Sequence, residues 1–422
     1  MELRLVAVAA TIALTCGCAQ SPASRALPGA PVAGSRGAVS AARSNETVLY
    51  SFSGYTDGGD PAADLVADSS GTLYGTTVVG GEYGCGTVFN LAPVKKPPWN
   101  ENVLYGFDCY GTGKNPYGGV AFDAAGNLDG TTVNGGACGS YGCGVVFQLA
   151  AGGGETVLHD FAGGDDGSGP GGGVAIDKRG NVYGTTPDGG ADGYGVVYGV
   201  SRRHGTWRES VIHTFTGGAD GSVGSLGRLL IDPSGNLYGV TEEGGTARHG
   251  TVFELSRRKG TWNLTTLYTF TGAPDAASPY GGLVADSSGN LYGTTYFGGS
   301  INAGAVFELI RHGNGSYRER VLYSFTGSVD GGNPTSTLVF GASGDLYGTT
   351  SNGGNSCGSY GCGVVFALDP KGRKESVLHA FGGASDGQHP YYGLLLGKNG
   401  VFYGTTAAGG NSNQGVVFEV KP

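Results

Sequence analysis

Aspartate and tyrosine side chains recur at matched positions along this 422-residue chain, and they are the residues best suited to bind a ligand. The aspartates of this series are Asp57, Asp166, Asp220, Asp275, Asp330 and Asp386. A Pro-Tyr pair follows in three of the repeats, and it ends in Tyr117, Tyr280 and Tyr391. A ring of carboxylates and aromatic rings suits a cation, a cationic group or a sugar stacked on tyrosine. The alternative is that each Asp closes an Asx turn that the Pro stiffens.

No arrangement of residues predicts a catalytic centre. Two GxSxG matches, at 354–358 and 383–387, do not lie between a strand and a helix as a nucleophile elbow requires. His159, His213 and His379 stand where other repeats carry Tyr, which indicates packing, and the remaining histidines are single loop residues. The adjacent pairs Asp165-Asp166 and Glu242-Glu243 are interpreted as solvated loop charge. We therefore expect no cofactor and no metal centre, with a cation on the acidic face as the one ion to consider.

The cysteine spacing predicts three disulfides. Cys138 and Cys143 flank the residues GSYG, and Cys357 and Cys362 flank the same four residues, so each pair is expected to close its own loop. Cys85 stands at the position of Cys143 without a near partner, and Cys109 lies in the next loop on the same rim, which predicts the third bridge. A zinc site is the weaker alternative, because no His or second Cys pair stands at zinc-ligand spacing.

The elements that position these residues belong to a sequence repeated seven times. A glycine in the motif LYGTT or its variants recurs every 54 to 56 residues, at Gly75, Gly130, Gly184, Gly239, Gly293, Gly348 and Gly404. Each repeat contains four short runs with strand character, typified by GGLVADSSG, NLYGTT, AVFEL and VLYSF. Four-stranded meanders repeated radially predict an all-β, seven-bladed β-propeller. The chain enters with a fourth-type strand at 46–52 and ends with a third-type strand at 415–420, so we expect the first strand to complete the last blade.

The motifs GNLYGTT, GTVFEL and VLYSFTG resemble the GloVer-type tandem repeat of the choice-of-anchor family of exported bacterial proteins. The resemblance covers about 46–420 and implies attachment to a surface by an anchor that differs between members, with no catalytic residue to carry over. Two copies depart from the pattern. Asp129 replaces the strand Tyr in the second repeat and Val240 replaces a Thr in the fourth, so less regular blades are expected there.

The start of the chain predicts export. Residues 1–18 read as a signal peptide with a lipobox-like ending in which Cys18 is the lipidation site, and simple signal cleavage is the alternative. Residues 19–44 form an Ala-, Ser-, Pro- and Gly-rich linker, and 45–422 form the propeller. The outer membrane, the cell surface or the periplasm is the expected location. The net charge of -9 and the sequence pI near 5.2 argue against a nucleic-acid partner.

Two classes of function follow from the repeats. The first is a monomeric, non-enzymatic binding or adhesion scaffold for an extracellular glycan or protein, attached to the membrane by its N-terminal lipid. The second is a propeller lyase or glycosidase that acts on an extracellular polymer, which requires acid and base residues unique to a few blades. The turns between third and fourth strands carry many Lys and Arg residues, and we expect them on the face opposite the inter-blade aspartates, where they would meet anionic headgroups.

Overall fold

A computed structural model describes residues 45–61, 63–224, 227–354, 357–358 and 360–422. The predicted signal peptide, the linker and the lipidation site at Cys18 lie outside the described residues. Across the part of the chain that the structure describes, no helix is long and apolar enough to cross a membrane.

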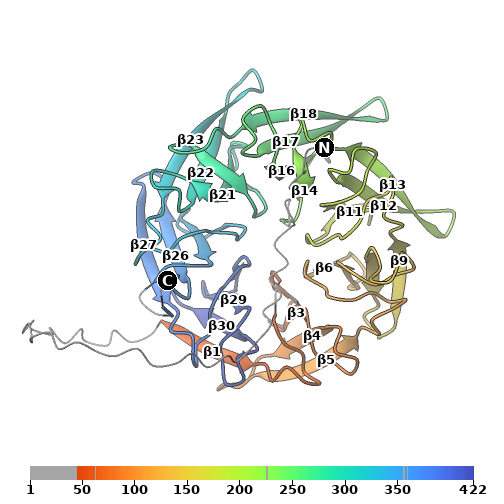
Figure 1. Ribbon diagram of the computed structural model, residues 1–422. Coiled ribbons are helices and arrows are strands. Elements are labelled where there is room, and N and C mark those ends of the chain that lie inside the picture. Colours follow the sequence, from red (N-terminus) through yellow and green to blue (C-terminus); the bar gives the residue numbers. More distant parts are fainter. Residues whose placement is uncertain (1–44, 62, 225–226, 355–356, 359) are drawn as a thin grey trace, which may run out of the picture. The chain divides into compact units, whose positions relative to one another are not determined.

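Seven antiparallel sheets form the blades of a closed β-propeller, as predicted (Figure 1). Blades 1 to 3 contain β2 (Val66–Ala67), β3 (Leu73–Thr77), β4 (Thr87–Ala92), β5 (Asn100–Gly106); β6 (Val120–Phe122), β7 (Leu128–Thr132), β8 (Val145–Leu149), β9 (Glu155–Asp160); and β10 (Ala175–Ile176), β11 (Val182–Thr186), β12 (Val196–Arg203), β13 (Thr206–Thr214). Blades 4 and 5 contain β14 (Ser222–Gly224), β15 (Leu230–Ile231), β16 (Leu237–Glu243), β17 (Thr251–Arg258), β18 (Thr261–Thr269); and β19 (Ala276–Pro279), β20 (Val284–Ala285), β21 (Leu291–Gly298), β22 (Ala305–Arg311), β23 (Tyr317–Ser324). Blades 6 and 7 contain β24 (Val339–Phe340), β25 (Leu346–Thr350), β26 (Val364–Asp369), β27 (Lys374–Ala380); and β28 (Leu395–Leu396), β29 (Phe402–Thr406), β30 (Val416–Val420), β1 (Glu46–Ser51).

The first strand closes the ring. β1 pairs with β30 in antiparallel register from Glu46 opposite Val420 to Ser51 opposite Val416. The backbone N–H of Lys421 also donates to the carbonyl of Asn45 at 3.0 Å. This pairing satisfies two edges that would otherwise be open, and it confirms the predicted closure.

The repeated motifs are explained by packing within and between blades. In LYGTT the glycine leaves room for a phenylalanine of the next strand, because a Cβ at Gly75 would lie 2.9 Å from the Phe89 ring. The last Phe of each outer strand is buried against the next blade, as in the edge-on pair of Phe52 and Phe89, whose ring centroids lie 5.1 Å apart. The apolar core therefore runs continuously around the ring, between neighbouring blades.

In four of the repeats the first Thr of the same motif joins neighbouring blades by a hydrogen bond. Thr131 donates to Gly172 O of the following blade at 3.0 Å, and Thr294 does the same to Ser336 O at 2.8 Å. Val240 cannot make this bond.

In blades 4 and 5 the innermost strand is divided into two short strands. β14 and β15 both pair with β16, and β19 and β20 both pair with β21. This is a departure from the expected four-stranded meander.

Asp129 does not make the second blade irregular, which corrects that expectation. Its side chain is buried and accepts a hydrogen bond from Gln148 Nε2 at 2.8 Å, and the blade keeps its four strands in register. Burial raises the pKa of Asp129 to about 7, against the lowering effect of that bond.

The meander gives the ring two faces. We call the side that carries the turns between third and fourth strands the hairpin face. The opposite side, which carries the loops between second and third strands and the loops between blades, is called the loop face. The long hairpins of blades 3, 4 and 5 stand out from the ring (Figure 1).

Candidate functional site on the loop face

The six aspartates of the inter-blade series bind their own turns and the outer strands. Asp330, for example, accepts from Thr326 N at 2.9 Å, from the Thr326 hydroxyl and from the Tyr323 hydroxyl at 2.9 Å. Asp57 and Asp275 repeat this pattern with Tyr50 and Tyr268, whereas Asp166, Asp220 and Asp386 meet His159, His213 and His379. The structure therefore places these aspartates in the turn role that the sequence left open as the alternative.

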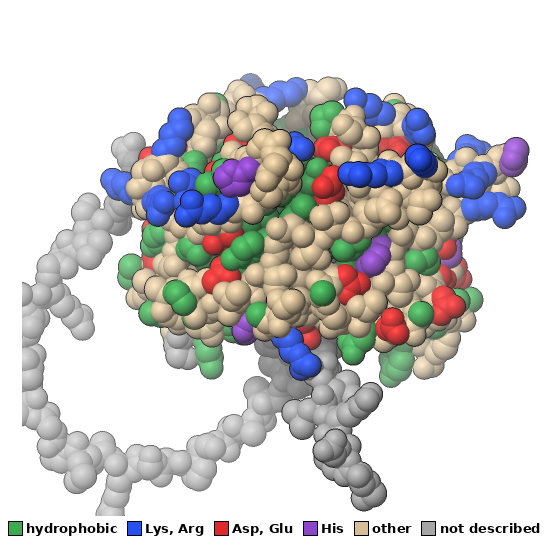
Figure 2. Space-filling model, turned by 90° about the horizontal axis from the view of Figure 1, so that it is seen from above, with side chains coloured by type: hydrophobic (Ala, Val, Ile, Leu, Met, Phe, Trp, Pro, Cys, Tyr) green, Lys and Arg blue, Asp and Glu red, His purple; other side chains and the backbone are tan. Residues whose placement is uncertain are grey.

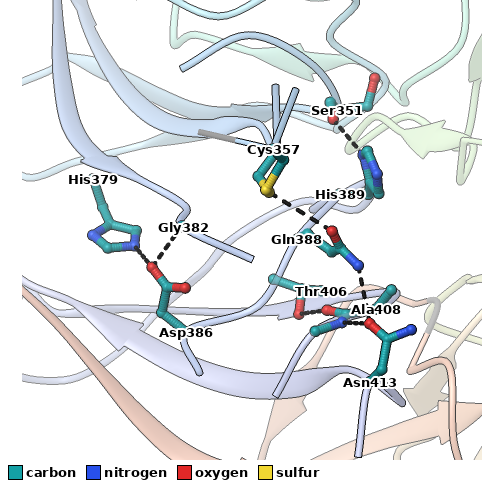
Figure 3. Close-up of a disulfide and its surroundings, with 12 residues drawn as sticks. Ser351, Cys357, His379, Gly382, Asp386, Gln388, His389, Thr406, Ala408 and Asn413 are labelled. Carbon is teal, nitrogen blue, oxygen red and sulfur yellow. Dashed lines mark hydrogen bonds and ion pairs between the residues drawn. A yellow bond between two sulfur atoms is a disulfide. The ribbon is translucent and has the colours of Figure 1, made fainter. Parts of the chain in front are cut away.

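Figure 3 shows this arrangement at the loop before the last blade. Asp386 points toward His379 Nε2, 3.2 Å away, and accepts from Gly382 N at 2.8 Å. His389, only three residues later, points the other way and contacts Ser351 O at 2.9 Å. Burial alone would raise the pKa of Asp386, but the bonds from His379 and Gly382 N hold that pKa below its ordinary value.

The tyrosines of the Pro-Tyr pairs lie elsewhere, and the local backbone explains why. The residue before the proline has a positive φ at four of these loops. The angles are 53° at Asp60, 56° at Asn115, 54° at Ser278 and 57° at His389. This left-handed turn is one that Asp and Asn tolerate well. The proline ring then packs on the preceding blade, as at Gly86, where a Cβ would lie 2.6 Å from Pro116 Cδ.

Asp60 is a carboxylate that influences two of these tyrosines, Tyr117 and Tyr391. Burial raises its pKa to about 6, and its Oδ1 is buried without a hydrogen-bond partner in the described structure. Burial first, and then the charge of Asp60, raise the pKa of Tyr117 and Tyr392. The pKa of Tyr391 rises through burial, followed by the influence of Tyr296 and Asp60. These residues belong to blades 1, 2, 5 and 7, so groups from blades that are not neighbours influence one another on the loop face.

A second carboxylate completes the cluster on the other side. Burial raises the pKa of Glu242, while a hydrogen bond with Tyr280 opposes that rise. The rings of Tyr280 and Tyr296 lie 5.7 Å apart, and Tyr296 bonds with Asn352. Glu242 is half-buried in this cluster, so its interpretation as solvated loop charge is wrong, although Glu243 is exposed. We call Asp60, Tyr117, Glu242, Tyr280, Tyr296 and Tyr391 the tyrosine mouth.

Further tyrosines are exposed in the loops of the loop face. Among the described residues, six tyrosines are between 43% and 79% exposed: Tyr55, Tyr83, Tyr110, Tyr141, Tyr194 and Tyr360. All six lie in loops of the loop face. They stand in Gly-rich loops without a fixed pattern, and the repeated GSYG is the one sequence signal that marks two of them, Tyr141 and Tyr360.

The three disulfides lie in the same loops and have the predicted partners. Cys85 pairs with Cys109, Cys138 with Cys143, and Cys357 with Cys362. The loops that they close carry Tyr83, Tyr110, Tyr141 and Tyr360. Such bridges are typical of proteins that mature in an oxidising compartment.

A hollow of about 310 Å³ opens between blades 4 and 5 on this face. Its lining includes His249, Ser278, Phe297 and Asn302. Ser278 comes two residues before Tyr280, and Phe297 follows Tyr296 with its ring 42% exposed. Two of its lining residues are thus close in sequence to two tyrosines of the mouth. In the described part of the chain, no group of three or more His, Cys, Asp or Glu side chains is placed to hold a metal ion.

Comparison with protein families gives two overlapping matches to the model of the Gloeobacter/Verrucomicrobia repeat, over residues 137–357 and 265–422. The chain belongs to this repeat family. The match confirms the predicted GloVer-type resemblance. A search of curated proteins by sequence finds no match for this repeat protein.

Solved structures share its fold at low sequence identity. The periplasmic gluconolactonase PpgL of Pseudomonas aeruginosa matches with 16% identity and a TM-score of 0.51, over 83% of this chain and 95% of that one. A candidate 6-phosphogluconolactonase of Bacteroides uniformis matches with 15% identity and a TM-score of 0.52, over 82% and 90%. The extracellular domain of the candidate hybrid two-component system BT3049 of B. thetaiotaomicron matches with 10% identity and a TM-score of 0.53, over 90% and 41%. At these identities the likeness concerns the fold alone.

The outer strands of the repeat protein also carry a half-buried acid that was not predicted from the sequence. A Glu stands four residues before the Tyr or His of six outer strands: Glu46, Glu101, Glu155, Glu209, Glu319 and Glu375. Burial raises the pKa of each to about 7. An Asp of the preceding blade adds to the rise, as Asp57 does for Glu101. The signal was the recurrent E-x-V-L-Y pattern, in which blade 4 has Leu264 in place of Glu.

Proposed function

We propose that this protein is an exported, surface-attached binding scaffold that takes an extracellular glycan on its loop face. The observation that carries the proposal is the gathering of exposed tyrosines on that one face, around a mouth lined by tyrosines and two carboxylates. A tyrosine ring offers an apolar surface for stacking against a sugar and a hydroxyl for hydrogen bonding. Asp60, Glu242 and Asn352 supply further polar atoms for sugar hydroxyls.

The disulfides support a binding role for these loops. Ordering a flexible loop on binding costs free energy, so a loop that is already closed by a bridge binds more tightly with the same contacts. Four of the six exposed tyrosines lie in loops held by the three bridges. Tyrosine itself adds large contact area at a low cost in side-chain entropy.

The test is a screen of neutral and acidic oligosaccharides against the full chain, followed by calorimetry on the tightest binder. Replacing Tyr141 and Tyr360 by Ser should weaken binding at least tenfold, because both stacking surfaces are removed. Replacing Val211 and Val377, exposed on outer strands, by Ser is the matched control and should change nothing. Equal losses in the two double variants, or a screen without any binder, would refute the proposal.

A polymer-cleaving enzyme is the second candidate, and one observation favours it. Burial raises the pKa of Asp60 and of Glu242, and a raised pKa brings a carboxyl group closer to what a general acid needs. Incubating the full chain with the same oligosaccharides separates the two candidates. New reducing ends or unsaturated products that disappear in Asp60→Asn would favour the enzyme, and intact saccharides favour the scaffold.

A further inference from the structure

Positive charge gathers at the tips of three neighbouring hairpins. Residues 200–208, 256–263 and 310–318, which join β12 to β13, β17 to β18 and β22 to β23, contain eight Lys and Arg residues and no Asp or Glu. They are Arg202, Arg203, Arg208, Arg257, Arg258, Lys259, Arg311 and Arg318, and all eight are exposed. The whole chain has the opposite balance, with 34 acidic and 25 basic residues. We call this surface the cationic hairpins.

The charge of these hairpins is not neutralised within the described structure. The five ion pairs among the described residues include none of the eight side chains. Arg257 instead donates from Nε to Gly260 O at 3.3 Å and lies over the Trp262 ring, 5.8 Å from its centroid. Trp262 in turn contacts Tyr183 of the preceding blade, with ring centroids 6.2 Å apart. The hairpins are therefore braced against the ring while their charges face solvent.

All three tips lie on the hairpin face. In the edge-on view of Figure 2, most Lys and Arg side chains collect toward one face, while acidic side chains lie among them, on the wall of the ring and toward the other face. The chain also enters the ring on the hairpin face, because β1 runs in the direction of a fourth strand and begins at Glu46, opposite Val420. The positive charge of the cationic hairpins and the start of β1 thus lie on the same face.

We propose that the cationic hairpins dock the ring on an anionic lipid bilayer. The eight charges belong to three blades and are distributed around part of the rim, so a plane of headgroups meets them together. Each Lys or Arg near such a surface adds a modest attraction that decays within a Debye length. The net charge of -9 disfavours a general attraction of the chain to an anionic surface, so the attraction has to come from a local group of basic residues such as the hairpins. Docking in this way leaves the loop face open to ligand.

Vesicle sedimentation of the full chain tests the proposal. Vesicles with phosphatidylglycerol should bind the chain in low salt and release it in 0.5 M NaCl, whereas phosphatidylcholine vesicles should not bind it. Arg257→Ser combined with Arg258→Ser should weaken binding by on the order of tenfold or more. Lys114→Ser combined with Arg248→Ser removes two charges from the loop face and should leave binding unchanged. Every variant keeps the same N-terminal segment, so lipidation of Cys18 cannot produce the difference.

Melting curves are compared first, because Arg257 also contacts Trp262. If the Arg257→Ser, Arg258→Ser variant is destabilised, Arg202→Ser combined with Arg203→Ser in the neighbouring hairpin replaces it. This second variant should show a similar loss of vesicle binding. Three results would overturn the proposal: binding that salt does not weaken, equal losses in hairpin and loop-face variants, and retention of the chain by a soluble anionic polysaccharide but not by the vesicles. None of these outcomes bears on glycan binding at the loop face, which has its own variants.

Discussion

The two faces of the ring are built from the same repeats yet present different chemistry. The loop face exposes tyrosines in loops held by three disulfides, around a mouth with two half-buried carboxylates. The hairpin face exposes arginines and lysines on turns that contain no disulfide in the described structure. The strands between the faces are nearly uniform. Function is therefore expected in the loops, where successive blades differ, and stability in the strands, where they agree.

The acidic residues illustrate the same division. Asp57 and its equivalents recur in six repeats and each is bonded within its own turn. Asp60 and Glu242 occur once each at their positions, and their pKa values are raised by burial. The six recurrent aspartates are bonded within their turns, whereas Asp60 keeps a buried carboxylate oxygen without a hydrogen-bond partner in the described structure, and Glu242 bonds with Tyr280.

The largest effect is expected from removing the strand that both faces share. Deleting 46–52 exposes the edge of β30 and leaves the core between blades 7 and 1 open, so the chain should aggregate or lose its cooperative melting transition. Deleting 19–44 instead should leave the melting temperature unchanged. Calorimetry of the two deletions measures the difference, and a normal transition without 46–52 would show that closure does not hold the faces together.

The next largest difference in stability is expected between variants of Asp330, which is bonded within its turn, and of Asp60 in the tyrosine mouth. Asp330→Asn weakens three hydrogen bonds to a buried carboxylate and should lower the free energy of unfolding by about 2 kcal/mol. Asp60→Asn removes a charge that burial disfavours and should leave stability equal or slightly higher. Urea unfolding at pH 7 compares them. A loss for Asp60→Asn as large as that for Asp330→Asn would abolish the proposed distinction.

The buried glutamates of the outer strands give a smaller, pH-dependent effect. Their pKa rises from 4.5 to about 7 on folding, so the folded state holds more protons between these values. Stability should therefore fall as pH rises from about 4.5 to about 7 and then level off. Glu101→Gln should remove the contribution of this one residue to the pH dependence of the free energy of unfolding. That contribution is about 1 kcal/mol after allowance for partial exposure, and urea unfolding across this pH range measures it. Exposed Glu82→Gln is the control, and identical pH profiles for the two variants would contradict the assignment.

Much of the fold could be predicted because the signals repeat. Seven copies of LYGTT and its variants, with a fourth-type strand at the start and a third-type strand at the end, determined blade number and closure. The cysteine pairs followed from loop spacing. The divided inner strands of blades 4 and 5 were not foreseen, because one of them begins at Ala276 where most repeats place a glycine with positive φ.

The candidate site was harder to predict, because its residues come from different blades. Tyr117, Tyr280 and Tyr391 were predicted together, and their role in binding a ligand stays a prediction. Asp60 and Glu242, which influence them in the structure, have no sequence signal that links them. The aspartates that were predicted together with these tyrosines lie in the same inter-blade loops but face other residues. Asp57 bonds Tyr50, whereas Asp60, three positions later in the same turn, influences Tyr117. Sequence alone does not show which way such a turn points its side chains.

The most direct test of the central claim is a map of side-chain protection over the whole ring. The full chain is nitrated at accessible tyrosines with and without the tightest oligosaccharide of the screen, and each site is read by mass spectrometry. We expect protection of Tyr141, Tyr360 and the tyrosines beside them, with the outer-strand Tyr268 unaffected. Protection confined to tyrosines outside the loop face, or none at saturating saccharide, would contradict the account.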